Sequence, residues 1–241
     1  MFRSLTLFVL ALVVAASAAQ AVTLDEVIQN NIDARGGIEK IRALKTLKFT
    51  GTMQTMGGEM SFVQWYKGNS KMRMDMKSEA FSMTQATDGI IAWGDNPFSG
   101  GSGPQVITGP QADNLHRQAD FAGDLIDHKE KGLTLELTGS EDLDGMTAYV
   151  VKVTDPTGDS HSIYIDAITW LEVKMVRKGA MMGQEMTLEV LLSNYQDIGG
   201  VIVPMQVDIR SDGMDLVSMT RNSFEANIPL DDEMFSLPSK E

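Results

Sequence analysis

The feature that most constrains the fold of this chain is an alternation of hydrophobic and polar residues with a period of two. Between Thr46 and Phe224 the alternation recurs in short segments, which places hydrophobic side chains on one face of extended strands. Turn signals such as Asp88-Gly89 separate the segments, and connections this short join antiparallel neighbours. We therefore predict an antiparallel meander with strands at 47–50, 60–63, 71–77, 80–87, 133–138, 148–154, 160–165, 170–177, 185–195, 201–209 and 216–224.

Three segments have helical signals instead. Thr23 and Glu26 have the spacing of a capping box, and the helix that follows is expected to end at Gly36. A short second helix is predicted at 38–44. A third helix is expected to begin near Pro110 and to pack across the sheet, because small and aliphatic residues recur on one side of it.

The first 21 residues have the layout of a secretory signal peptide. One early cation, Arg3, precedes a hydrophobic run from Leu5 to Ala16, and small residues end at Ala21, where we expect cleavage. The hydrophobic run is shorter than the roughly 20 residues that a membrane-spanning helix needs. The mature chain, residues 22–241, is therefore predicted to be a single domain exported to the periplasm.

Net charge and cysteine content exclude several classes of protein. The formal net charge is −13, and it becomes −14 when Arg3 is removed with the leader, so the mature chain repels phosphate backbones and anionic membrane surfaces. Binding to nucleic acid is not expected. The chain has no cysteine and therefore neither a disulfide nor an attachment site for an N-terminal lipid. We expect a monomer without an anchor of its own.

The segment KMRMDMK at 71–77 raises the question of what three alternating methionines face. By strand parity Met72, Met74 and Met76 point inward, and the three charged residues between and after them point to water. The same test places Met175 in step with Val173. Methionine repacks easily, so a curved sheet with a methionine-rich face suits a variable hydrocarbon ligand. A chain of about 14 to 16 carbons offers on the order of 10 kcal/mol before ordering costs.

The residues that we predict to line an acyl-chain cavity share inward parity or a place on the covering helix. They are Met60, Phe62, Met72, Met74, Met76, Met186, Leu188, Met205 and Val207 from the strands, with Leu115 and Phe121 from the helix. Two other interpretations of the methionines stay open. In the first, the methionines fill an ordinary hydrophobic core. In the second, they bind Cu(I) together with Met53 and Met56, because thioethers are soft ligands that select this ion.

The glycine-rich residues 94–109 are predicted to form a long loop. The loop lacks the lysine and hydroxyl residue of a phosphate-binding loop. Trp93, Pro97 and Phe98 are our candidates for a flap that closes over the hydrophobic face, and an ordinary turn is the alternative.

No sequence pattern predicts catalysis or a bound cofactor. The three histidines do not form an HExxH motif, and the chain has no GxSxG. Asp159, Ser160 and His161 are consecutive, so their side chains alternate between the faces of a strand and cannot form a triad; we expect them at the surface. The sequence therefore favours a binding protein over an enzyme.

Several segments together resemble bacterial outer-membrane lipoprotein-sorting and lipoprotein-carrier proteins of the LolA and LolB type. These segments span the mature chain: ARGGIEKIRALKTLKFTG, DGIIAWGDNPFSG, RQADFAGDLID, SIYIDAITWLE, NYQDIGGVIVPMQV and NIPLDDEMFSLP. The resemblance implies a mainly β, α+β fold, in which a curved antiparallel sheet of about eleven strands forms a half-open β-barrel covered by helices and loops. It also implies that the concave face holds the acyl chains of a lipid or lipoprotein.

The resemblance carries further implications for partners and for one residue type. It implies transient contacts with membrane proteins that donate or accept the cargo. The lipoprotein carriers use an inward arginine that holds the covering helices; here Arg73 has outward parity and Arg117 lies on the central helix. Carriage of another lipid fits the same fold, and a sensor or scaffold module of the cell envelope is a further alternative.

Overall fold

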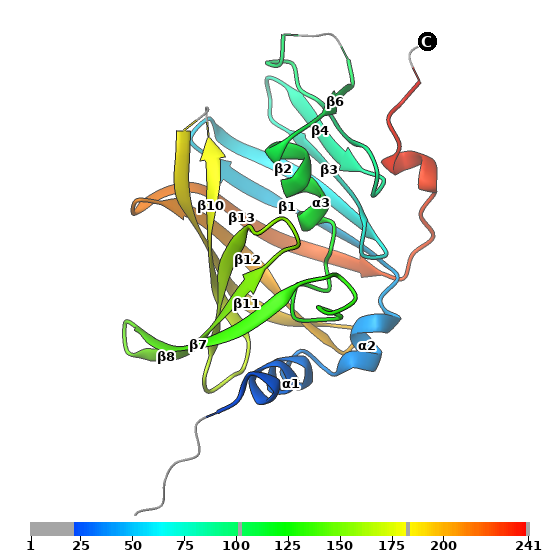
Figure 1. Cartoon of the computed structure of the whole chain (residues 1–241). Coiled ribbons are helices and arrows are strands. Elements are labelled where there is room, and N and C mark those ends of the chain that lie inside the picture. Colours follow the sequence, from blue (N-terminus) through cyan, green and yellow to red (C-terminus); the bar gives the residue numbers. More distant parts are fainter. Residues whose placement is uncertain (1–21, 101–102, 182–183, 240–241) are drawn as a thin grey trace, which may run out of the picture.

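One curved antiparallel sheet dominates the structure, a computed structural model that describes residues 22–100, 103–181 and 184–239. The predicted signal peptide lies outside the described residues. In the described part the sheet has 13 strands in the order β6-β5-β4-β3-β2-β1-β13-β12-β11-β10-β9-β8-β7, and it does not close. The expected half-open barrel of the α+β class is thus confirmed (Figure 1).

The strands form two meanders, β1–β6 and β7–β13, and the pairing of β1 with β13 joins them into one sheet. They are β1 (Thr46–Thr55), β2 (Gly58–Lys67), β3 (Lys71–Lys77), β4 (Ser82–Thr87), β5 (Ala92–Asp95), β6 (Gln105–Ile107), β7 (Thr134–Leu143), β8 (Met146–Thr154), β9 (Ser160–Asp166), β10 (Glu172–Met181), β11 (Gln184–Ile198), β12 (Val201–Ser211) and β13 (Met214–Ala226).

The helices begin where the sequence signals place them. Helix α1 (Leu24–Ala34) has Thr23 as its N-cap with a complete capping box to Glu26. Helix α2 (Ile38–Ala43) follows, and α3 (Pro110–Gln118) starts with proline at its first turn. Both α1 and α2 lie at one end of the curved sheet (Figure 1), whereas α3 packs against β3, β4 and β5. Among the described residues, no helix combines the length and hydrophobicity that crossing a bilayer requires.

Two strands lie in or next to the segment that we predicted to be a loop. Strand β5 pairs with β4, and the three-residue β6 pairs with β5. Strands of four and three residues are too short to show an alternation in the sequence. They form because β5 pairs with the edge of β4 and β6 then pairs with β5. The strand count therefore rises from the expected eleven to 13.

A close backbone contact joins two glycine-containing segments that lie far apart in the sequence. Gly36 has a φ of 108°, and a Cβ atom added there would lie 2.0 Å from the carbonyl oxygen of Gly200. The backbone N–H of Ile202 also donates to the carbonyl of Arg35 at 3.0 Å. The end of α1 is thereby joined directly to the β11–β12 turn.

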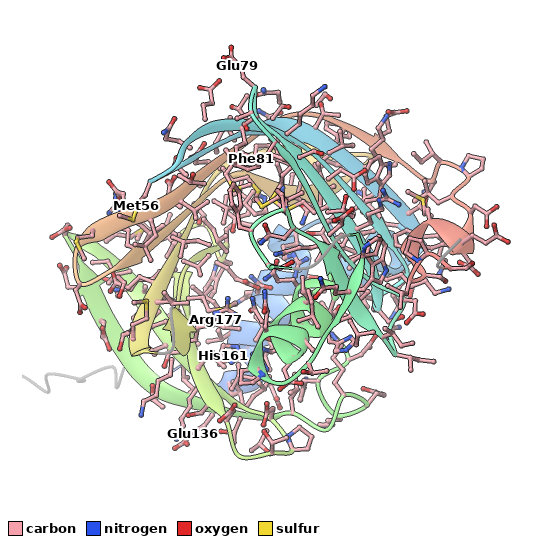
Figure 2. The ribbon with its side chains drawn as sticks, turned by 90° about the horizontal axis from the view of Figure 1, so that it is seen from above. Met56, Glu79, Phe81, Glu136, His161 and Arg177 are labelled. Carbon is pink, nitrogen blue, oxygen red and sulfur yellow. The ribbon has the colours of Figure 1, made fainter. Side chains whose placement is uncertain are left out.

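The concave face has a packed half, formed mainly by β1, β2 and β3. Met72, Met74 and Met76 are buried, with 1%, 7% and 7% exposure, which confirms their inward parity. They belong to the same hydrophobic cluster as Leu115 of α3 and Met205 of β12. Figure 2 shows from above how the strands surround the interior in which α3 lies. Along β1, β2 and β3 the interior is filled by side chains.

The C-terminal segment covers part of the opposite face of β3. Our prediction that the charged residues of β3 meet only water is therefore wrong for Arg73. Arg73 is half-buried; it forms an ion pair with Asp75 at 2.9 Å and donates to the carbonyl of Met234 at 3.0 Å. The indole N–H of Trp93 donates to the carbonyl of Phe235 at 2.8 Å. The 3-10 helix η1 (Asp232–Phe235) is held on this convex face by these contacts.

Candidate functional site

The second half of the concave face is hollow. A partly open cavity of about 320 Å³ lies between strands β9–β13 and residues 119–133, the covering segment that connects α3 to β7. This volume is within the range of small-molecule sites. The hydrophobic side chains that line the cavity are Phe49, Tyr66, Phe121, Ile163, Met175, Val190, Leu192, Val203, Val207, Ile209 and Met219.

Strand register aligns the hydrophobic wall of the cavity in rows that run across the strands. Met175 of β10 pairs with Val190 of β11, which in turn pairs with Ile209 of β12. In the next row Leu192 pairs with Val207, and Val207 pairs with Met219 of β13. Paired residues share a face, so each row is a continuous hydrophobic strip along the sheet.

Two irregularities of the strands turn further side chains toward the cavity. A register shift between Glu172 and Lys174 separates Glu172, which lines the cavity, from Val173, which packs in a cluster with Tyr164 and Val150. The prediction that Met175 is in step with Val173 is therefore wrong, because a bulge changes the parity.

The second irregularity lies in β11. Asn194 has a φ of 52°, in the left-handed region. Leu192 and Tyr195 both line the cavity although they are three residues apart, so the alternation is interrupted at Asn194. Asparagine tolerates this backbone conformation better than most residues.

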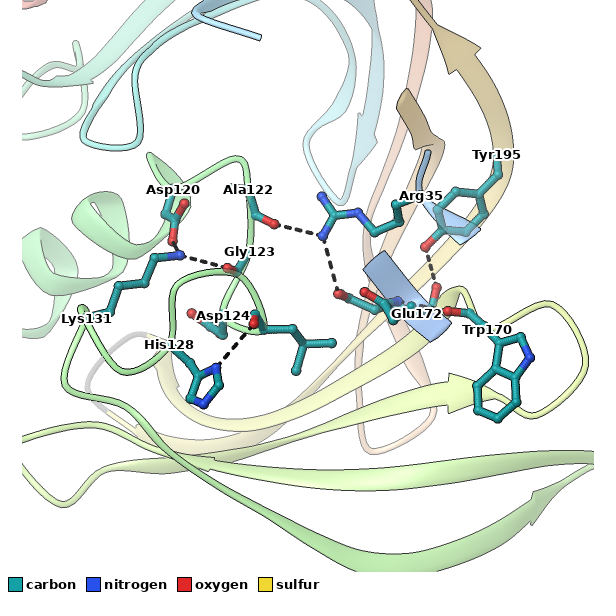
Figure 3. A network of polar contacts seen from close by, with 12 residues as sticks. Arg35, Asp120, Ala122, Gly123, Asp124, His128, Lys131, Trp170, Glu172 and Tyr195 are labelled. Atoms are coloured by element: carbon teal, nitrogen blue, oxygen red, sulfur yellow. Dashed lines mark hydrogen bonds and ion pairs between the residues drawn. The ribbon is translucent and has the colours of Figure 1, made fainter. Parts of the chain in front are cut away.

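Arg35 connects helix α1 to the segment that covers the cavity. Its side chain is buried, and its guanidinium donates to the carbonyl of Ala122 at 2.7 Å. The same nitrogen lies 4.0 Å from a carboxylate oxygen of Glu172. From the covering segment itself, Lys131 forms an ion pair with Asp120 and donates to the carbonyl of Gly123 at 2.8 Å (Figure 3). These contacts fix the segment above the sheet.

Arg35 is a buried arginine that contacts the covering segment. Of the two arginines considered in the sequence, Arg73 lies on the convex face, and Arg117 is an exposed residue of α3. Sequence reasoning missed Arg35 because it caps the end of a helix, where strand parity gives no information.

Burial dominates the protonation of the groups around Arg35. It raises the pKa of Glu172 above its ordinary value, although the charge of Arg35 opposes the shift. Burial and the nearby Glu172 raise the pKa of Tyr195, whose hydroxyl donates to the carbonyl of Glu172. Burial also raises the pKa of Asp120, against the effect of Lys131. Burial therefore disfavours the ionised forms of Glu172, Tyr195 and Asp120.

Charged side chains gather at one end of the cavity. His161 of β9 contacts Asp124 of the covering segment, with Nε2 and Oδ2 2.9 Å apart. Arg177 of β10 also lines the cavity, as does Arg117 of α3. Figure 2 shows His161 and Arg177 side by side between the sheet and α3. The prediction of a surface position for His161 is thus corrected, because the covering segment packs against it.

The structure separates the predicted cavity residues into groups. Phe121 and Val207 line the cavity. Met186 and Leu188 of β11 are half-buried. The others lie in the packed cluster: Met60, Phe62, Met72, Met74, Met76, Leu115 and Met205.

The three flap candidates also differ in position. Trp93 is 2% exposed in β5 and faces the convex side, so it does not close over the concave face. Pro97 and Phe98 are exposed in the β5–β6 connection, and the Phe98 ring packs edge-on against Phe81 with 4.9 Å between centroids.

Of the methionines considered as copper ligands, Met56 lies apart from the others, which belong to one buried cluster. Met53 and Met60 are buried, whereas Met56 is 85% exposed at the turn between β1 and β2. In the part of the chain that the structure describes, no three His, Cys, Asp or Glu side chains gather as metal ligands would.

Comparison with solved structures identifies the class of fold. The chain resembles the crystal structure of a LolA superfamily protein from Nitrosomonas europaea, with a TM-score of 0.59 and 15% identity over 90% of this chain and 98% of that one. It also resembles a DUF1329 family protein from Desulfovibrio piger, with a TM-score of 0.59 and 11% identity over 88% and 96% of the two chains.

A third similar structure is a protein domain from Vibrio parahaemolyticus described as outer membrane lipoprotein-sorting. Its TM-score is 0.56 and its identity 10%, over 87% of this chain and 94% of that one. No protein-family model and no curated protein matches the chain by sequence. The chain thus has the LolA-like fold that the sequence segments indicated.

Proposed function

We propose that this protein is a periplasmic carrier that binds one acyl chain of a lipid or lipoprotein in the cavity between β9–β13 and the covering segment. The proposal treats residues 22–241 as one exported domain that works without catalysis. Its cargo would pass to and from membrane proteins by transient contact. The observation that carries the proposal is a cavity walled by two continuous hydrophobic rows.

The size of the cavity matches a single hydrocarbon chain. An apolar cavity of about 150 Å³ binds benzene, so about 320 Å³ accommodates roughly a dozen carbon atoms. At about 0.8 kcal/mol per methylene, burial of such a chain contributes on the order of 10 kcal/mol before the cost of association. The open side of the cavity lets a longer chain extend beyond it.

The similar folds support the proposal in a general way. A LolA superfamily protein and a lipoprotein-sorting domain share this architecture. Their low identity to this chain leaves the type of cargo to be measured.

The test is uptake of a fluorescent fatty acid by the mature chain. Dansyl-labelled undecanoic acid is titrated against the protein, and its emission reports transfer into an apolar environment. Val207→Phe places a ring in the cavity and should weaken binding at least about tenfold, because it displaces several methylenes. Leu191→Phe is the matched control on the neighbouring strand, where Leu191 lies between two cavity residues and faces the other side.

Saturable binding that Val207→Phe weakens and Leu191→Phe preserves would support the carrier. Absence of binding to the folded chain, or equal effects of the two variants, would refute it. Extraction of lipids from protein purified out of its own periplasm identifies the cargo.

A further inference from the structure

We infer that the cavity selects an amphiphile with an anionic head group, a carboxylate or a phosphate, which Arg177 binds at the charged end while the hydrocarbon lies along the hydrophobic rows. This inference rests on the proposed function and names the chemical class of its ligand. Neutral lipids of the same chain length are bound more weakly.

The first observation is that the guanidinium of Arg177 lacks a partner of opposite charge. Its Nε is buried without a hydrogen-bond partner, and among the described residues it forms no ion pair. A buried donor left unsatisfied costs free energy, which a ligand oxygen would recover. Guanidinium groups bind carboxylate and phosphate with two parallel hydrogen bonds.

The second observation is the balance of charge around the cavity. Four arginines line it, against three carboxylates, in a chain of net charge −13. Each carboxylate already has a cationic or ionisable partner: Asp120 has Lys131, Asp124 has His161, and Glu172 has Arg35. The cavity is therefore a local positive region in an acidic protein.

The arginines other than Arg35 have no carboxylate partner among the described side chains. Arg221 lies over the ring of Phe49 at 4.4 Å and donates to the carbonyl of Pro204 at 2.9 Å, so its position is fixed by other contacts. Burial and then the charge of Arg117 lower the pKa of Arg177, and the charge of Asp124 opposes this shift less strongly. An anion placed between two like charges relieves this repulsion.

The third observation is the position of Arg177 relative to the hydrophobic wall. Arg177 and Met175 are two residues apart on β10 and face the same cavity, a separation of about 6.6 Å along the strand. Met175 belongs to the first hydrophobic row. An anionic head group at Arg177 thus continues directly into a tail that crosses Val190 and Ile209.

The experiment compares head groups at constant chain length. Dodecanoate, dodecyl phosphate and dodecanol compete at pH 8 with the dansyl probe on the mature chain, and acetate and inorganic phosphate test whether an anion binds without a tail. The native protein should prefer the two anionic amphiphiles to dodecanol by about 10- to 100-fold. The carboxylate and phosphate arms show which head group is the better ligand.

Two variants of Arg177 and a control at Arg210 test whether Arg177 causes the preference. Arg177→Gln should lower the ratio of dodecanoate to dodecanol affinity toward one, and Arg177→Lys, which keeps the charge, should restore part of it. Arg210→Gln is the control, because Arg210 forms an exposed ion pair with Asp215 and lies outside the cavity lining. It should leave both affinities unchanged. Circular dichroism verifies folding, and Arg117→Gln gives a second, milder reduction if Arg177→Gln fails to fold.

Equal affinity of the native protein for dodecanoate and dodecanol would overturn this inference and leave the carrier proposal intact. An unchanged ratio in folded Arg177→Gln would also overturn it. Failure of every amphiphile to bind would instead refute the carrier itself. Competition by acetate or inorganic phosphate at the affinity of dodecanoate would show an anion site that does not use the hydrophobic rows, and would likewise overturn the inference.

Discussion

Replacement of Arg35 by methionine should destabilise the protein by about 3 to 5 kcal/mol at pH 8. The side chains of Arg35 and Glu172 are only 10% and 14% exposed, so removal of the cation leaves a buried carboxylate without compensation. The bond to the carbonyl of Ala122 is lost as well, which by itself costs about 1 to 3 kcal/mol. The double variant Arg35→Met/Glu172→Gln should therefore recover about 2 kcal/mol.

The destabilisation should shrink as pH falls. Burial holds the pKa of Glu172 above 4.5 in the folded protein, and Arg35 opposes this shift, so its removal raises the pKa further. A carboxyl with a raised folded-state pKa contributes stability that is present below 4.5 and is lost as pH rises through the folded-state value. Arg35→Met should thus cost less at pH 5 than at pH 8.

Urea unfolding followed by circular dichroism at pH 5, 6.5 and 8 measures these free energies for the native chain, both single variants and the double variant. The cycle removes contributions of the other titrating groups, because they are common to all four proteins. A cost of Arg35→Met that is equal at the three pH values, or one that Glu172→Gln does not reduce, would refute the buried pair as its cause.

Three further predictions concern the scaffold. Met74→Ala should lower the free energy of unfolding by about 2 to 5 kcal/mol yet leave the dodecanoate affinity of the folded protein unchanged, because Met74 lies in the packed half; calorimetric titration that finds weaker binding would contradict this. Gly36→Ala should cost about 2 kcal/mol or more in urea unfolding, since its Cβ would meet the Gly200 carbonyl at 2.0 Å; an unchanged midpoint would argue against the contact. Trp93→Phe should cost about 0.5 to 1.5 kcal/mol and accelerate proteolysis of the C-terminal segment, because the hydrogen bond to Phe235 is lost; equal cleavage rates would show that other contacts hold the segment.

Most of the helices and strands could be predicted from local sequence patterns. The capping box at Thr23, the proline at the start of α3 and the alternation in KMRMDMK each specify an element and, for strands, a face. Strand β6 has only three residues, so no alternation is visible in it and its existence depends on pairing with β5.

The position of the cavity, unlike the strands and helices, could not be predicted from local sequence patterns. Parity tells which face a side chain occupies but not whether that part of the face is filled, and filling depends on where α3 and the covering segment pack. Met74 and Met175 both face inward, yet only Met175 lines the hollow. One residue in the sequence could have indicated the cavity. Arg177 is a charged residue on the inward face of β10, and a packed hydrophobic core disfavours a charge at such a position.

The most direct test of the account uses the methionines themselves as reporters. In protein labelled with ¹³C at the methionine methyl groups, dodecanoate should shift the resonances of Met175 and Met219, which line the cavity, and leave those of Met72, Met74 and Met76 in the packed half nearly unchanged. Single Met→Leu substitutions assign the signals. Shifts confined to Met72, Met74 and Met76 would place the hydrocarbon in the other half of the sheet and contradict the account.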